Sequence, residues 1–293
     1  MLKNLKIISI SLLLFVLFTQ NCFSGELNNQ ASFKYPVHNP VPGGIAIIEL
    51  KTKDKNKPDV FYKNKKIMVR KNAGHWQAIV GLSLNTKSGQ HKIKIKTKDK
   101  KLKYQIFATK NKEYKKQYIT LKNKGMVTLS PENLKRAISD KKISKKAFAT
   151  WLEKNNIKLD FIMPVDGIVS SRFGLKRFFN KKPRKPHSGI DIAAPTGTLI
   201  KSPADGRVIA TGNFYFNGNV VFVDHGQGLI TMFCHMNKIN VSKNQIVKKA
   251  DKIGEVGETG RVTGAHLHFS VSLNNTRIDP ELLLPPIPEL KDK

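Results

Sequence analysis

The sequence predicts a mainly β fold with a small N-terminal β domain, a short helical linker and a C-terminal β-rich domain. Short apolar runs alternate with polar turns from Tyr35 to about Leu121, which is typical of a β domain. A helix-start signal follows near Ser130, and from Asp160 onward glycines recur between short β-rich runs. The 293 residues are enough for two domains of ordinary size.

Residues 1–24 are predicted to be a signal peptide. Lys3 and Lys6 form its positive region, residues 7–18 form its apolar core, and residues 22–24 offer a cleavage site before Gly25. Lipid anchoring is disfavoured because Thr-Gln-Asn precedes Cys22 in place of small residues. The protein is therefore expected to be exported to the periplasm or cell envelope. Cleavage would leave Cys234 as the single cysteine, so no intrachain disulfide is expected.

The chain is strongly basic, with 52 Lys and Arg residues against 21 Asp and Glu residues and a formal net charge of +31. Such a charge favours polyanionic partners. Specific nucleic-acid binding is not expected, because the lysines are spread along the chain and no nucleic-acid motif or row of interleaved aromatic residues accompanies them. For an exported protein, the alternatives are binding to anionic polymers of the wall or of the membrane surface, or a lysine-rich composition with no specific partner.

The N-terminal β domain is expected over residues 35–121. Its strand candidates are GGIAIIEL (43–50), KKIMVR (65–70), WQAIVGLSL (76–84) and HKIKIKT (91–97). In the last run, Ile93 and Ile95 alternate with lysines, which is the pattern of a strand with one buried face and one solvated face. Turn residues over 85–89 separate the last two candidates.

Residues 122–157 are expected to form the helical linker, with two short helices. Ser130 suits a helix cap, Pro131 the first helical position and Glu132 the positive end of the helix. Apolar residues then recur at helical spacing in two groups, and the second group predicts docking on a neighbouring element. The groups are Leu134, Ala137 and Ile138, and then Ala147, Phe148, Trp151 and Leu152.

The C-terminal domain is expected over residues 158–288, and GAHLHFSVSL (264–273) is its most informative strand. Alternation places His266 and His268 on one face together with Ser270 and Ser272, and the apolar residues on the other. Two histidines at positions i and i+2 are about 6–7 Å apart at Cα, because a strand rises about 3.3 Å per residue. Both imidazoles can therefore converge on one metal ion or polarised substrate.

A metal site is also indicated by His187, which precedes Asp191 by four residues in KPHSGIDIAAPTGT. The proline and glycine residues around it predict a loop running into a strand, and on a strand positions i and i+4 share a face. A carboxylate and two neutral imidazoles form an ordinary three-ligand zinc set that leaves one position open for water. His187, Asp191 and one histidine of the 266/268 pair would complete such a set.

His235 ends the run LITMFCH, where alternation predicts that it shares a face with Leu229, Thr231 and Phe233. A base or an electrophile at this position is possible. Cys234 is expected to point to the other side as a small buried hydrophobic residue, which argues against a nucleophilic role. His225, in VDHGQG, is interpreted as a structural residue at a turn.

These residues resemble the lysostaphin-type, or LytM-like, zinc endopeptidases of bacterial peptidoglycan. Three motifs occur in the order typical of that family, and flanking sequence agrees as well. The motifs are HSGIDIAAPTGT with His187 and Asp191, FCHM with His235, and GAHLHF with His266 and His268; the flanking segments are SRFG (171–174), ADGRV (204–208), VDHG (223–226) and GETGRVTG (257–264). One departure is Phe-Cys-His-Met at 233–236, where the family commonly has Tyr-Ala-His-Leu.

The resemblance implies that His187, Asp191 and His268 bind Zn²⁺ and that His235 and His266 are the catalytic pair. It also implies a β-rich domain in which an antiparallel sheet floors a groove, with the peptide stems of peptidoglycan as substrate. In such a site the zinc lowers the pKa of a bound water, and a histidine can orient or deprotonate that water. The N-terminal β domain resembles more loosely the domain that precedes such peptidases in some Gram-negative bacteria. Its expected role is wall binding, partner docking or occlusion of the groove.

Other functions remain open from the sequence. Some LytM-like domains lack ligands and activate other wall hydrolases, so a catalytically silent activator or wall-binding protein is the main alternative; here all five key positions are filled. The glycine-punctuated strands also resemble biotinyl or lipoyl carrier domains, but that interpretation gives the five polar groups no task. The sequence does not indicate an oligomeric state or which bond of the cross-link is cut.

Overall fold

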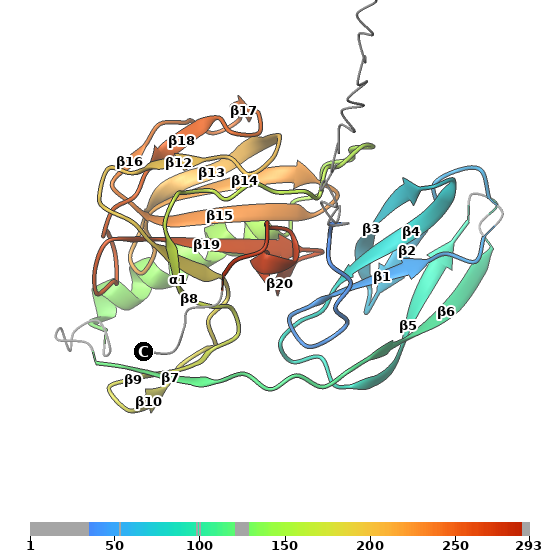
Figure 1. Cartoon of the computed structure of the whole chain (residues 1–293), viewed down its shortest axis with the longest axis horizontal. Helices are drawn as coiled ribbons and strands as arrows, with labels where there is room; N and C mark the ends of the chain where they lie inside the picture. The colour runs from blue at the N-terminus through green and yellow to red at the C-terminus, as the bar shows by residue number, and fades with distance from the viewer. Residues whose placement is uncertain (1–34, 53, 98, 100, 121–128, 289–293) are drawn as a thin grey trace, which may run out of the picture. The chain divides into compact units, whose positions relative to one another are not determined.

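Strands β1 to β6 of the N-terminal domain are shown in Figure 1. A computed structural model describes residues 35–52, 54–97, 99, 101–120 and 129–288. The predicted signal peptide, including Cys22, lies outside these described residues, as do positions 121–128 of the predicted linker. The described residues belong to one compact unit that spans Lys34–Lys293.

The N-terminal domain is a six-stranded antiparallel sheet in the order β1-β4-β3-β2-β5-β6. Ile93 and Ile95 are buried, whereas Lys92 and Lys96 are exposed, so the alternation predicted for HKIKIKT is confirmed. The four predicted strands are all present. The bounds are β1 Ile45–Glu49, β2 Asp59–Tyr62, β3 Lys65–Asn72, β4 His75–Gly81, β5 Gly89–Lys96 and β6 Leu102–Thr109.

Over residues 129–157, the described part of the predicted linker, the structure contains one helix, α1 (Pro131–Phe148), where the sequence predicted two. The Ser130 side chain accepts a hydrogen bond from the Asn133 amide, so the predicted cap is confirmed. The helix continues through the lysine-rich middle, where the Ser144 hydroxyl bonds back to the Asp140 carbonyl. The good helix formers of this segment, mainly lysines, thus carry one helix across the expected break.

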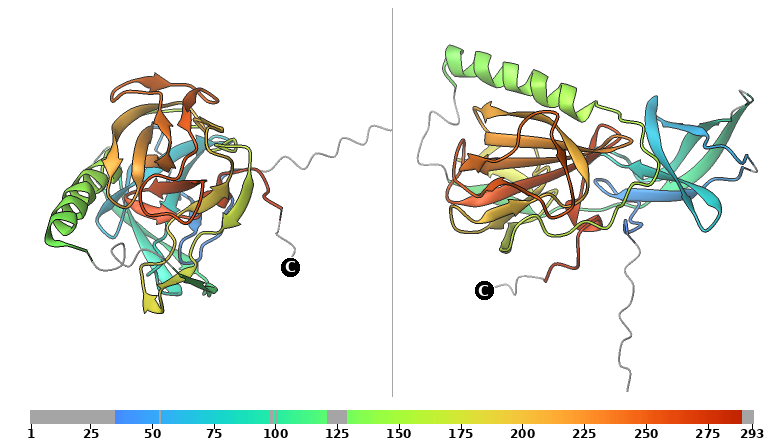
Figure 2. Two further views of the ribbon diagram at one scale, coloured as in Figure 1. Left: turned by 90° about the vertical axis from the view of Figure 1, so that its left-hand side faces the viewer. Right: turned by 90° about the horizontal axis from the view of Figure 1, so that it is seen from above.

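The apolar docking of α1 is confined to the end of the helix, while Arg136 and Asp140 make polar contacts with Asn213 and Tyr215. Ala147 and Phe148 are buried, as predicted, against strands β13 (Gly206–Phe214), β14 (Gly218–Gly226) and β15 (Leu229–Met236). Leu134 and Ile138, by contrast, are 49% and 48% exposed. Trp151 and Leu152 follow the helix and do not extend its face. Figure 2 shows α1 lying along one side of this sheet.

The C-terminal domain is built on an eight-stranded antiparallel sheet. Seven strands follow the order β17-β13-β14-β15-β19-β11-β8, and β20 also pairs with β19. The bounds are β8 Ile168–Ser171, β11 Ile190–Ala193, β13 Gly206–Phe214, β14 Gly218–Gly226, β15 Leu229–Met236, β17 Ile246–Val247, β19 His266–Leu273 and β20 Thr276–Ile278. The mainly β fold with an N-terminal β domain is confirmed.

Two smaller sheets and a short 3₁₀ helix complete the described fold. One sheet has the order β12-β18-β16, and the other has the order β10-β9-β7, in which β7 runs parallel to β9. The bounds are β7 Lys116–Ile119, β9 Lys176–Phe179, β10 Lys182–Pro183, β12 Leu199–Lys201, β16 Lys238–Ile239, β18 Lys252–Glu255 and η2 Pro280–Leu282. No helix in the described part of the chain is long and apolar enough to cross a membrane.

The two faces of the eight-stranded sheet are both buried, but in different ways. One face carries the main apolar core, with Leu267, Phe269 and Phe233 among its buried residues. On the opposite face, α1 covers strands β13–β15 with a second apolar cluster, and strands β19, β11 and β8 carry polar residues beside it. The predicted division of β19 into an apolar face and a polar face is therefore confirmed. The polar residues of this face lie on the neighbouring strands β19, β11 and β8.

Candidate metal and catalytic centre

Strand pairing brings two of the predicted zinc ligands together. Asp191 on β11 is the direct antiparallel partner of His268 on β19, and paired residues of a sheet point to the same face. His187 lies in the loop just before β11 and is fixed there by two backbone hydrogen bonds, from its amide to Leu175 and to its carbonyl from Gly174. All three side chains are buried.

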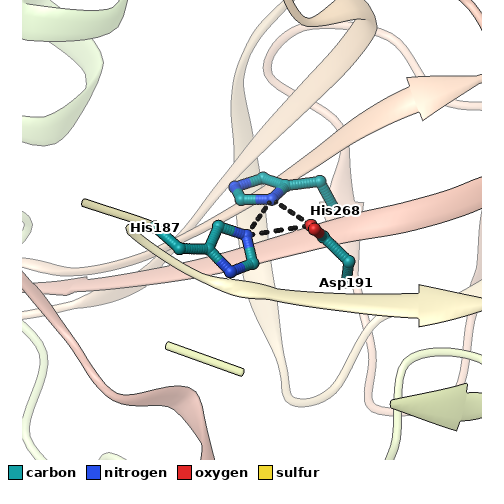
Figure 3. A group of neighbouring side chains, drawn as sticks. All are labelled: His187, Asp191 and His268. Carbon is teal, nitrogen blue, oxygen red and sulfur yellow. Dashed lines mark hydrogen bonds and ion pairs between the residues drawn. The ribbon is translucent and has the colours of Figure 1, made fainter. Parts of the chain in front are cut away.

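The three side chains meet at one point, shown in Figure 3. Asp191 Oδ1 lies 2.9 Å from His187 Nε2 and 2.7 Å from His268 Nδ1, and these two nitrogens are 3.0 Å apart. Ligands at about 2.0 Å from a tetrahedral zinc ion are about 3.3 Å apart. The observed separations are only slightly shorter, so small movements would admit the ion.

The outer hydrogen bonds of the two histidines indicate which ring nitrogen faces the cluster without a proton. His187 Nδ1 is 2.8 Å from the Arg172 carbonyl, which can only accept, so Nδ1 carries the proton. His268 Nε2 is 2.9 Å from Ser270 Oγ, whose hydroxyl donates to the Ser188 carbonyl, so Nε2 carries the proton. His187 Nε2 and His268 Nδ1 then offer lone pairs beside a carboxylate oxygen. Three facing lone-pair donors repel one another unless a cation lies between them, so the donor set fits zinc.

The charge states also suit a metal site. Burial alone would raise the pKa of Asp191, but hydrogen bonds and positive charge from His187 and His268, whenever their facing nitrogens are protonated, hold that pKa well below the ordinary value. Burial lowers the pKa of His268. The site therefore contains an ionised carboxylate and a neutral imidazole near neutral pH, which are the ligand forms that bind zinc.

His235 reaches the same face of the sheet, but not by the alternation that the sequence predicted. The pairing of β14 with β15 slips between Asn219 and Val221, so Cys234 and His235 together oppose one residue, Val220. His235 itself has a φ of 64°, in the left-handed region. A bulge of this kind redirects a side chain. The prediction that His235 shares a face with Phe233 is wrong, because the bulge turns His235 toward His266 and His268.

His235 and His266 form a pair beside the cluster. Their ring centroids are 4.9 Å apart, and the His235 ring is 6.2 Å from that of His268. Each ring donates from Nδ1 to a carbonyl, His235 to Thr259 and His266 to Gly264, both at 2.8 Å. Each therefore keeps an unprotonated Nε2. Burial lowers the pKa of His235 to about 3, so this imidazole is neutral at pH 7.

Cys234 is buried as predicted. The prediction that it points to the opposite side of the sheet from His235 is wrong. Cys234 pairs directly with His268 and so lies on the polar side of the sheet, not on the opposite side from His235. Its side chain belongs to the apolar cluster under α1, and Asn217 donates a hydrogen bond to its sulfur. Burial raises the pKa of the thiol to about 12, which excludes a thiolate nucleophile near neutral pH.

His225 is a structural residue, as the sequence indicated. Its Nδ1 donates to the Asp205 carbonyl and its Nε2 accepts from Thr231, both at 2.9 Å. The ring is fully buried at the end of β14, and burial lowers its pKa to about 4. It takes no part in the metal cluster.

The buried His225 predicts a pH-dependent stability. Its pKa rises from about 4 to the ordinary 6.5 on unfolding, so its contribution is fully present above pH 6.5 and is lost as the pH falls toward 4. Between pH 7 and pH 5, we expect the free energy of unfolding to fall by about 2 kcal/mol more for the wild type than for His225→Gln. Urea unfolding at the two pH values measures this difference, and equal losses in both proteins would contradict it.

Three residues beside the ligands were not singled out by the sequence: Arg177, Ser171 and Gln117. Arg177 Nη2 donates to Asp191 Oδ2 at 2.5 Å and to Ser171 Oγ at 2.9 Å, while its Nε donates to Gln117 Oε1 at 3.0 Å. Arg177 and Gln117 are 60 positions apart in the chain. Their contact depends on the pairing of β7 with β9, for which no local pattern in the sequence gave a signal.

A cleft of about 310 Å³ opens beside Asp191 and His266. Its lining includes Ser170 and Ser171 of β8, Arg177 of β9, and Gln117 and Ile119 of β7. Residues 263–265, which precede β19, line it as well. A bound peptide in this cleft would lie next to the metal cluster and to one histidine of the pair.

Two family models match the chain. The model for peptidase family M23 matches residues 185–280, which contain all five residues of the cluster and the histidine pair. The model for the peptidase family M23 N-terminal domain matches residues 38–110, which contain strands β1–β6 and the chain just after them.

One solved structure and two curated proteins agree with these matches. A crystal structure from Pseudomonas aeruginosa described as a peptidase M23 is 38% identical, covers 85% of this chain and 96% of its own, and superposes with a TM-score of 0.72. The peptidoglycan DD-endopeptidase ShyA of Vibrio cholerae is 41% identical over 111 residues, which are 37% of this chain and 26% of ShyA. The DD-carboxypeptidase/endopeptidase Mpg of Neisseria meningitidis is 35% identical over 122 residues, 42% of this chain and 28% of Mpg. The match thus spans about a quarter of these two curated relatives.

Proposed function

The chain belongs to peptidase family M23, and on this premise we propose that it is a zinc-dependent endopeptidase that hydrolyses the peptide cross-links of bacterial peptidoglycan. The observation that carries the proposal is the buried meeting point of His187, Asp191 and His268, where two imidazole lone pairs and a carboxylate oxygen face one another. Two of its curated relatives are named a peptidoglycan DD-endopeptidase and a DD-carboxypeptidase/endopeptidase, which supports the same substrate.

In this mechanism the histidine pair moves the proton. Zinc, when bound, supplies a Lewis acid for the scissile carbonyl and lowers the pKa of the attacking water. His235 and His266 hold their Nδ1 protons on backbone carbonyls, so a neutral Nε2 of the pair can take the proton of that water. The resulting imidazolium can stabilise the oxyanion and then protonate the leaving amine. The pair thus performs the acid and base steps without a glutamate.

The bond we propose is the DD cross-link between peptide stems. ShyA is named a peptidoglycan DD-endopeptidase and Mpg a DD-carboxypeptidase/endopeptidase, which supports a DD bond as the bond that is cut. The cleft beside Asp191 lies next to His266 and is open to a peptide chain. Export to the periplasm or cell envelope, proposed from residues 1–24, would bring the protein to this substrate.

The lysine-rich surface supports a second contact with the envelope. On one face of the N-terminal sheet, Lys92 and Lys96 lie opposite the exposed apolar residues Ile106 and Leu102 of the edge strand β6. Together with the net charge of +31, this arrangement supports binding to anionic wall or membrane-surface polymers. Such binding would hold the enzyme near its substrate without contributing to the bond cleavage.

Digestion of purified peptidoglycan tests the proposed function. We expect the chain from residue 25 to release fragments whose masses correspond to cut DD cross-links, and we expect a chelator to stop the release. Mass spectrometry of the soluble fragments identifies the bond. A catalytically silent activator would release nothing by itself and would increase release by a separate wall hydrolase, and that outcome would replace the proposal.

A further inference from the structure

We propose that strand β7 is a working part of the active site, in which Gln117 positions Arg177, Arg177 positions Asp191, and Ile119 forms a wall of the substrate cleft. This inference rests on the proposed function. It assigns a catalytic task to a strand that lies outside both matched segments, which cover residues 38–110 and 185–280.

Strand β7 is firmly attached to the C-terminal domain. It pairs in parallel with β9, with Gln117 opposite Arg177 and Tyr118 opposite Phe178. The Tyr118 and Phe178 rings stack with centroids 4.9 Å apart. Backbone hydrogen bonds extend the pairing at both ends, from Lys176 to Lys115 and from Asn180 to Ile119.

The chain just before β7 also contacts Gly174, a residue that is hydrogen-bonded to the second ligand, His187. The Tyr114 ring lies against Gly174, where a Cβ atom would be only 2.0 Å from the ring and where φ is +84°. Only glycine suits this close approach and this conformation. The Gly174 amide donates to the carbonyl of His187. The segment from Tyr114 to Ile119 therefore touches the surroundings of two of the three ligands.

The two oxygens of the Asp191 carboxylate have different partners. Oδ1 faces His187 and His268, while Oδ2 accepts from Arg177 Nη2 at 2.5 Å. The Arg177 and Asp191 side chains are 17% and 11% exposed, so the ion pair is largely shielded from water. A carboxylate held at Oδ2 offers Oδ1 to a metal ion in a fixed direction, which is how outer partners orient metal ligands.

Gln117 in turn fixes Arg177. Its Oε1 accepts from Arg177 Nε at 3.0 Å, while Ser171 accepts from Nη2, so the guanidinium is held along one edge. Arg177 also brings a positive charge toward the metal site, which by itself weakens zinc binding. Replacement of Gln117 by alanine changes no charge. Its effect on zinc affinity therefore measures orientation alone.

The same face of β7 lines the cleft. Gln117 and Ile119 are half-buried lining residues, whereas Lys116 and Tyr118 alternate with them and are exposed. A substrate peptide in the cleft would therefore contact Ile119, and polar replacement of Ile119 should affect substrate binding more than zinc binding. Lys116, on the opposite face of the same strand, is the matched control.

The experiment uses the full mature chain and two readouts: the zinc dissociation constant by competition with a chromogenic chelator, and kcat and KM on a cross-linked muropeptide dimer. We expect Gln117→Ala and Arg177→Lys to weaken zinc binding by about 10-fold or more, since outer-shell partners typically contribute 10–100-fold. Gln117→Glu keeps the acceptor oxygen and should retain tight binding. Ile119→Ser should raise KM with the zinc affinity unchanged.

Lys116→Ala and Lys176→Gln are the controls, because they lie beside the tested residues and are exposed. Amide hydrogen exchange of residues 116–119 shows whether a variant keeps β7 in place. Wild-type zinc affinity and kinetics in both Gln117→Ala and Ile119→Ser would overturn the inference. A wild-type chain that binds no zinc would instead refute the proposed function, so the two failures are distinct.

Discussion

His268→Ala and Asp191→Ala are expected to abolish zinc binding and peptidoglycan hydrolysis together. Each substitution removes one of three donors whose ligand atoms lie within 4.8 Å of one another. Loss of an outer-shell partner alone costs about 10–100-fold in metal affinity, so loss of a ligand should cost more than about 100-fold. In Asp191→Ala, Arg177 also loses its buried carboxylate partner.

The measurement is the zinc content after dialysis, together with the rate of fragment release from purified peptidoglycan. His225→Gln serves as the control, because it also changes a buried histidine of the same sheet but lies outside the cluster. At pH 7.5 this control should retain both zinc and activity. Full activity in either ligand variant would contradict the assignment of the metal site.

His266→Ala is expected to retain zinc and to lose catalysis. Its Nε2 lies 3.9 Å from Asp191 Oδ1 and carries no proton, so the side chain can act on a water beside the cluster without being a ligand. General acid–base groups typically contribute about 100- to 10,000-fold to the rate. A drop in kcat of this size with one bound zinc ion per chain is the expected result.

His235 should be replaced by a residue that can adopt its left-handed backbone conformation. Its φ of 64° lies in the left-handed region, which asparagine tolerates better than most residues. His235→Asn should therefore keep the bulge and the bound zinc while kcat falls as in His266→Ala. Isothermal zinc titration and single-turnover digestion measure the two properties separately. Loss of zinc in both His235→Asn and His266→Ala would contradict the catalytic role and would indicate that the two histidines are zinc ligands.

The fold was largely predictable because its strands obey local patterns. In HKIKIKT and in GAHLHFSVSL, period-two alternation distinguished the buried face from the other face without knowledge of the partners. The same pattern placed His266 and His268 together, and the spacing of His187 and Asp191 indicated a shared site. These features depend only on residues close in the chain.

The remaining features depend on contacts that a local pattern does not contain. The direction of His235 follows from a register slip against β14, so alternation along β15 alone gave the wrong face. The contact of Gln117 with Arg177 follows from a parallel pairing across 60 positions. The single helix α1 differs from the prediction because the helix propensity of its lysine-rich middle exceeded the effect of an interrupted apolar stripe.

Zinc titration of the chelator-treated wild type tests the central claim most directly. The chain should be inactive on purified peptidoglycan without metal. Its rate of DD cross-link cleavage should then rise linearly with added zinc and level off at one equivalent per chain, as one group of His187, Asp191 and His268 requires. Undiminished cleavage by the metal-free chain, or zinc bound with no cleavage at any ratio, would contradict the account.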